Sequence, residues 1–150
     1  MNVLIVDDHP VVAEYLRNAA GRAVPDAVVR LASDLESAFE IMHDHPADLV
    51  MLDLGLPGCD GIESVLRFRK EYPDARVVVI SSEDERNSIR GCLALGAAGF
   101  IPKTAGPKEM VNALRIVAAG GRYIPADAPG GDTEAPGGVE DGRDTGTGNR

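Results

Sequence analysis

The chain has 150 residues, which is enough for one domain, and 44% of them are hydrophobic although there is no Trp. The formal net charge of −9 argues against a chain that grips nucleic acids or an anionic membrane by itself, because phosphate binding needs clustered Lys and Arg. No apolar run reaches the ~18 residues of a membrane span, and the N-terminus lacks the basic region of a signal peptide. Its two cysteines have no metal-like spacing and suggest a reduced, cytoplasmic protein more than a disulfide scaffold.

Five short apolar runs alternate with five segments of helical periodicity along residues 1–125. The runs predict strands at residues 2–7, 27–32, 48–54, 75–81 and 98–103. Helical spacing follows each run: Val12, Tyr15, Leu16 and Ala19; Leu35, Ala38, Phe39 and Met42; Ile62, Val65 and Leu66; Ile89 and Leu93; and Met110, Val111, Leu114 and Val117. The first and last helices have a proline in their first turn, and the last is expected to run from Pro107 to about residue 119.

Alternating strands and helices predict an α/β fold with a five-stranded parallel sheet and helices on both faces. Runs without polar interruption are typical of strands that are covered on both sides, and right-handed crossovers then give a doubly wound, flavodoxin-like sheet. Pro102 favours an edge position for the last strand, which fits the strand order 2-1-3-4-5.

The composition changes at about residue 126. Residues 126–150 hold seven glycines, no aromatic residue, and six acids against two bases. Such a segment cannot bury enough apolar surface to offset the entropy of ordering. We therefore expect a domain at residues 1–125 and a flexible, acidic, Gly/Pro-rich linker or tail at residues 126–150.

Polar side chains stand where the predicted strands end, at one rim of the sheet. They are Asp7 and Asp8 after the first strand, Asp53 in the third, Ser81 and Ser82 in the fourth, and Lys103 after the fifth. In parallel sheets this rim is where ligands bind. Carboxylates that converge there repel one another, and a hard divalent cation such as Mg²⁺, which takes oxygen ligands, would relieve that repulsion.

Each residue of this set also has an ordinary explanation. The two adjacent aspartates could cap a helix in a solvated loop, Ser81 and Ser82 could cap the next helix, and Lys103 could be a surface lysine. Asp53 is harder to explain in this way, because it lies between Leu52 and Leu54 in an apolar run. The joint placement at one rim favours a site in which Asp53 acts as a nucleophile that forms an acyl phosphate.

Four segments, "VLIVDDHPVV", "DLVMLDLGLPGCDGIE", "VVVISSEDE" and "GAAGFIPK", resemble the motif blocks of response-regulator receiver domains of two-component signalling. The resemblance covers about residues 2–124. "DDHP" and the stretch from Lys103 to Ile124 are similar to the LuxR/NarL type, in which a linker and a helix-turn-helix DNA-binding domain usually follow the receiver. One departure is Thr104, which stands where many receivers have Pro directly after the lysine.

The resemblance implies a role for each residue of the rim. Asp53 would accept a phosphoryl group from the phosphohistidine of a sensor histidine kinase. Mg²⁺ would bind to Asp8, Asp53 and the backbone carbonyl of Gly55, and to Asp7 through a water. Lys103 would bind a phosphoryl oxygen, while Ser81 and the aromatic Phe100 would be the switch residues. Phe100 could equally be a core residue of the last strand.

The leading interpretation is a phosphoacceptor signalling domain rather than an enzyme, with at most weak autophosphatase activity. It would change conformation on phosphorylation, with homodimers as one result, and control an output, most simply transcription through a DNA-binding domain outside this chain. The alternatives are a stand-alone receiver that acts by protein–protein interaction, and a pseudo-receiver that is never phosphorylated. A phosphatase of the haloacid-dehalogenase type would need a second acid at position 55, where this sequence has Gly55.

Overall fold

The computed structural model describes residues 1–82 and 87–125, and in these ranges strands and helices alternate strictly. The expected tail at residues 126–150 lies outside the described residues. The elements are β1 (Asn2–Val6), α1 (Pro10–Ala23), β2 (Val28–Ala32), α2 (Leu35–Asp44), β3 (Leu49–Asp53), α3 (Gly61–Glu71), β4 (Arg76–Ser81), α4 (Ile89–Ala94), β5 (Gly99–Pro102) and α5 (Pro107–Ala118). Each strand begins and ends within one residue of the bounds of the apolar run that predicted it.

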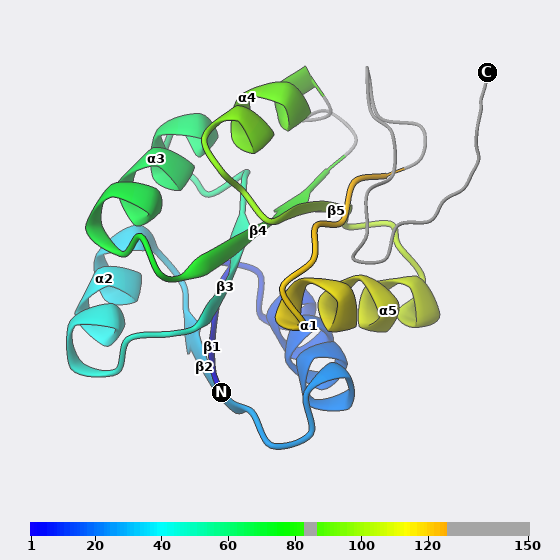
Figure 1. The fold of residues 1–150 in the computed structure, drawn as a ribbon. Coiled ribbons are helices and arrows are strands. Elements are labelled where there is room, and N and C mark those ends of the chain that lie inside the picture. Colours follow the sequence, from blue (N-terminus) through cyan, green and yellow to red (C-terminus); the bar gives the residue numbers. More distant parts are fainter. Residues whose placement is uncertain (83–86, 126–150) are drawn as a thin grey trace.

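The strands form one all-parallel sheet in the order β2-β1-β3-β4-β5, as the sequence predicts. Helices α1 and α5 lie together on one face of the sheet, and α2, α3 and α4 cover the other (Figure 1). This is the doubly wound, flavodoxin-like arrangement. It leaves the carboxyl ends of β1, β3, β4 and β5 side by side at one rim.

The central strands are buried on both faces, which explains their continuous apolar runs. Along β3, Leu49 and Met51 pack toward α1 and α5, whereas Val50 and Leu52 pack toward the helices of the other face. All four side chains are at most 1% exposed. The alternation continues to Asp53, the last residue of β3, and so brings a carboxylate to the end of a fully buried strand.

Local sequence signals set several helix boundaries. The side chain of Asp34 caps α2 by accepting a hydrogen bond from the Ser37 N–H, at 2.7 Å. Asp60 caps α3 in the same way, and its backbone carbonyl accepts a hydrogen bond of 3.0 Å from the hydroxyl of Ser64. This bond lets Ser64 be buried, whereas Leu66, one of the residues whose spacing predicted this helix, is 39% exposed. The helix that Ile62, Val65 and Leu66 predicted is confirmed, and Leu66 lies at the margin of its buried face.

The outer edge of β5 is covered by the segment that follows α5. Tyr123 pairs with Gly99 in a parallel bridge, with hydrogen bonds of 3.0 Å from Phe100 N–H to the Tyr123 carbonyl and from Tyr123 N–H to the Ala98 carbonyl. The guanidinium of Arg76 donates to the carbonyl of Val117 and to that of Gly121. These bonds hold residues 117–123 against the sheet. In the described part of the chain, no helix has the length and apolar character needed to cross a bilayer.

Candidate functional site

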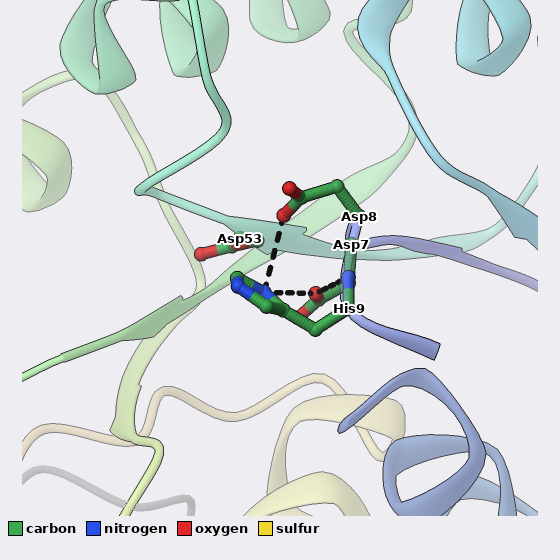
Figure 2. Close-up of side chains that lie close together, drawn as sticks. All are labelled: Asp7, Asp8, His9 and Asp53. Atoms are coloured by element: carbon green, nitrogen blue, oxygen red, sulfur yellow. Dashed lines mark hydrogen bonds and ion pairs between the residues drawn. The ribbon is translucent and has the colours of Figure 1, made fainter. Parts of the chain in front are cut away.

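The acid cluster lies at the carboxyl ends of β1 and β3, the two central neighbours in the sheet. Val6 is in register with Leu52, so Asp7 and Asp8, which follow β1, come opposite Asp53. One side-chain oxygen from each of these acids and one ring nitrogen of His9 all lie within 4.8 Å of one another. Figure 2 shows the three residues after β1 converging on Asp53 from the neighbouring strand.

Two of these carboxylates are almost completely shielded from water. Asp7 is 4% exposed and Asp53 is 1% exposed, and the Oδ2 atom of each is buried without a hydrogen-bond partner. Burial raises the pKa of Asp7 above its ordinary value of 3.8, and the charge of Asp53 raises it further. The backbone N–H and ring of His9, together with the charge of Lys103, partly offset these effects on the pKa. The three carboxylates of the site thus carry more negative charge than the nearby positive charge of Lys103 neutralises.

Lys103 supplies the nearest positive charge to the acceptor candidate. Its Nζ lies 3.1 Å from Oδ1 of Asp53, and the same oxygen accepts a hydrogen bond of 2.9 Å from the backbone N–H of Gly55. A backbone bond of 2.6 Å from Lys103 N–H to the Ser81 carbonyl joins the ends of β5 and β4. The carboxylate of Asp53 is therefore held through one oxygen while the other makes no hydrogen bond.

The two candidate switch residues lie inside the protein. Ser81 ends β4 and is 1% exposed, and its hydroxyl oxygen is buried without a hydrogen-bond partner. Phe100, in β5, is also 1% exposed and packs in the core on the side of α2, α3 and α4. A buried hydroxyl without a partner costs about 1–3 kcal/mol, so Ser81 would gain from an acceptor brought to the rim.

Two contacts at the site were not predicted from the sequence. Nδ1 of His9 lies 3.1 Å from both Asp7 Oδ1 and Asp8 Oδ1, although a surface histidine is the ordinary expectation for a loop. The hydroxyl of Tyr15, in α1, donates a hydrogen bond of 3.0 Å to the carbonyl of Ala105, in the loop that follows Lys103. The position of His9 directly after the acids was the one available signal. In that same loop the Lys103–Thr104 peptide is trans, since no peptide bond within the described ranges is cis.

The donor set fits a hard divalent cation. Such ions prefer carboxylate and carbonyl oxygens, and the acid cluster offers several carboxylate oxygens within 4.8 Å of one another. Two buried oxygens without hydrogen-bond partners, Asp7 Oδ2 and Asp8 Oδ1, are a further sign, because buried polar atoms in proteins are nearly always satisfied. The rest of Asp8 is partly open to solvent, with a side chain that is 29% exposed.

Comparison with known proteins finds a family model that matches most of the described residues. The model of the response regulator receiver domain matches residues 3–115. The glycerol metabolism activator of Pseudomonas putida is 33% identical over 126 residues, which cover 83% of this chain and 57% of that protein. The transcriptional activator protein ExaE of the same species is 36% identical over 124 residues, which cover 83% of this chain and 58% of ExaE. The chain thus spans less than two thirds of the length of these relatives.

Solved structures resemble the chain in the same region. A LuxR family DNA-binding response regulator from Silicibacter pomeroyi matches with a TM-score of 0.73 and 31% identity, covering 83% of this chain and 97% of that one. The isolated receiver domain of RcsB from Salmonella enterica serovar Typhimurium, solved with the phosphomimetic BeF₃⁻, matches with a TM-score of 0.75 and 25% identity. That match covers 83% of this chain and 93% of the RcsB domain.

Proposed function

The chain belongs to the response regulator receiver domain family, and from this premise we propose that Asp53 is its phosphoacceptor. The observation that carries the proposal is the asymmetry of the Asp53 carboxylate. Oδ1 is fixed by Gly55 N–H at 2.9 Å and by Lys103 Nζ at 3.1 Å, while the buried Oδ2 has no hydrogen-bond partner. A carboxylate held in this way presents one free oxygen as a nucleophile.

The phosphoryl donor would be the phosphohistidine of a sensor histidine kinase. A lone pair of Asp53 Oδ2 forms the new oxygen–phosphorus bond, the phosphorus–nitrogen bond of the phosphohistidine breaks, and its electron pair stays on the donor imidazole. Lys103, already at the acceptor carboxylate, would bind a phosphoryl oxygen as a point charge. Slow attack of water on the acyl phosphate would return Asp53 to its free form, which is the weak autophosphatase activity we infer.

The acid cluster would hold Mg²⁺ during the transfer. Asp8, Asp53 and the backbone carbonyl of Gly55 are the proposed direct ligands, and Asp7 would act through a water. Mg²⁺ bound there supplies neutralisation of the charge on the phosphoryl oxygens. The unpaired Oδ2 of Asp7 supports a cation requirement, and so does the raised pKa of Asp7, because burial and then the charge of Asp53 disfavour its ionised form unless a cation is bound.

Phosphorylation would act as a switch through Ser81 and Phe100. The buried hydroxyl of Ser81 lacks an acceptor, and a phosphoryl group on Asp53 brings three strong ones to the same rim. Movement of Ser81 toward that group would change the packing around Phe100, which lies in the neighbouring strand β5. The protein would then have two conformations, one before and one after this movement. The phosphoryl group can change their relative populations only if it interacts more favourably with one conformation than with the other.

We propose that this switch controls transcription in the cytoplasm of the cell. Relatives such as ExaE are transcriptional activators, and this chain covers only 58% of ExaE. In this proposal residues 1–125 are the receiver and residues 126–150 are a linker to a DNA-binding domain, with homodimer formation as one consequence of phosphorylation. Reading the gene past residue 150 tests it: a basic helix-turn-helix is expected, and a stop codon there would favour a stand-alone receiver instead.

The phosphoacceptor claim is tested with a small donor. The chain is incubated with Mg²⁺ and acetyl phosphate, and intact mass spectrometry should show the addition of one phosphoryl group. Asp53→Asn should abolish the adduct. The matched control is Asp48→Asn, because Asp48 is an exposed acid next to the opposite end of β3. An adduct that persists in Asp53→Asn, or none in the unaltered chain with Mg²⁺, would refute the claim.

A further inference from the structure

His9 is placed inside the acid cluster rather than beside it. Its Nδ1 lies 3.1 Å from Oδ1 of Asp7 and 3.1 Å from Oδ1 of Asp8, as the dashed lines of Figure 2 show. The backbone N–H of His9 independently donates to Asp7 Oδ1 at 2.8 Å. The imidazole is thus the one nitrogen group in the set of possible metal ligands found among the described residues.

The two distances from Nδ1 have the length expected between neighbouring ligands of a single metal ion. Metal–nitrogen and metal–oxygen bonds of later first-row ions are about 2.1 Å long, so two ligands at a right angle lie about 3.0 Å apart. Nδ1 stands at nearly this separation from an oxygen of each aspartate. A later first-row ion held by these three atoms, with Asp7 bound directly rather than through a water as proposed for Mg²⁺, would therefore require little rearrangement of the side chains.

The imidazole alone does not satisfy the oxygens around it. Nδ1 carries at most one hydrogen, and its contact with Asp7 Oδ1 is a hydrogen bond, whereas the buried Asp8 Oδ1 makes none. Asp7 Oδ2, in a side chain with no exposed surface, also lacks a hydrogen-bond partner. These are the unpaired acceptors that a cation at the centre of the cluster would meet.

We propose that His9 is a metal ligand through Nδ1, and that it gives this site a specific affinity for later first-row transition-metal ions such as Ni²⁺ and Zn²⁺. Imidazole nitrogen is a good ligand for these ions, whereas Mg²⁺ prefers oxygen and gains little from it. The bound form has the ring proton on Nε2, which leaves the Nδ1 lone pair for the metal. The proposal rests on the proposed function only in that both use the same carboxylates.

The test compares metals rather than activities. Isothermal titration calorimetry with Ni²⁺ and with Mg²⁺ is performed on the unaltered chain, on His9→Ala and on His43→Ala. His43 is the matched control, because its Nδ1 lies 3.2 Å from Asp44 Oδ1 on an exposed surface of α2. The His9→Ala change keeps the backbone N–H that holds Asp7, so the carboxylates stay in position. ¹⁵N NMR of the imidazole rings with diamagnetic Zn²⁺ reports on Nδ1 directly.

We expect His9→Ala to weaken Ni²⁺ binding about tenfold or more, to change Mg²⁺ binding by less than about threefold, and His43→Ala to change neither. Zn²⁺ should shift the Nδ1 signal of His9, and Mg²⁺ should not. Unchanged Ni²⁺ affinity in His9→Ala overturns the proposal, and so does an equal loss for Ni²⁺ and Mg²⁺, which would mean that His9 only positions the acids. Failure of the phosphoacceptor claim is seen separately, as loss of the Asp53 adduct with Mg²⁺.

Discussion

The pair formed by Lys103 and Asp53 allows a quantitative prediction about stability. Lys103 Nζ lies 3.1 Å from Asp53 Oδ1, and the side chain of Lys103 is 21% exposed whereas that of Asp53 is fully buried. At an effective permittivity of about 20, Coulomb's law gives an attraction of about 5 kcal/mol at this distance. Desolvation of both groups offsets part of it, so a coupling energy of about 2–3 kcal/mol should remain.

The perturbation is a double-mutant cycle with Lys103→Met, Asp53→Asn and the two together. Lys103→Met should lower the free energy of unfolding by about 3 kcal/mol, because it leaves a buried carboxylate facing Asp7 without its cation. Asp53→Asn should change it by less than about 1 kcal/mol, since loss of the ion pair is balanced by loss of that repulsion. The double variant should then lose less free energy of unfolding than the sum of the losses in the two single variants.

The assay is urea unfolding at neutral pH with a chelator present, so that no divalent cation shields the acids. The matched control is the pair of Arg17 and Glu14 on α1, which are 3.4 Å apart with side chains 48% and 56% exposed. An exposed pair of this kind should show a coupling energy below about 0.5 kcal/mol. If the coupling of Lys103 and Asp53 were equally small, the electrostatic account of the acceptor would be wrong.

Three further predictions concern the metal-free chain. Because the pKa of Asp7 is raised in the folded state, stability should fall as the pH rises from 3.8 through that higher pKa, and Asp7→Asn should remove this decline in urea unfolding. Gly61→Ala should cost about 1–3 kcal/mol, since its methyl group would lie 2.5–2.7 Å from side-chain and carbonyl atoms of Leu54. Gly21→Ala, with nothing within 4 Å of the added methyl group, should instead stabilise α1 by about 0.5–1 kcal/mol, and urea unfolding measures both glycine variants. Tyr15→Phe should cost about 1 kcal/mol through loss of its hydrogen bond to the loop after β5, as measured by urea unfolding.

The fold follows from the sequence because its determinants are local and periodic. Apolar runs without interruption set the buried strands, and Pro102 indicated the edge position of β5, so the strand order could be inferred and was confirmed. The spacing of Ile62, Val65 and Leu66 predicted α3, but spacing alone does not show that Leu66 lies at the exposed margin of the helix. Burial of Ser64 depends on a hydrogen bond to Asp60 that no periodicity reports.

The candidate site was predictable as a position, but not as a set of contacts. Parallel strands bring their carboxyl ends to one rim, which places Asp53 near the acids after β1 whatever the side-chain rotamers are. The contact of His9 with both neighbouring aspartates depends on rotamers and on the turn before α1. The bond from Tyr15 to Ala105 joins residues 90 positions apart. Apart from the position of His9 directly after the two acids, the sequence gives no sign of either contact.

The bridge between Tyr123 and Gly99 also has a mechanical meaning. Two backbone bonds of 3.0 Å fasten the chain at Tyr123 directly to β5, on both sides of Gly99. Tension applied to the chain beyond Pro125 would reach the sheet at these bonds first, next to Phe100, before it loaded α5. A load on the chain after Pro125 would therefore act first on β5, the short strand that holds the candidate switch residue Phe100.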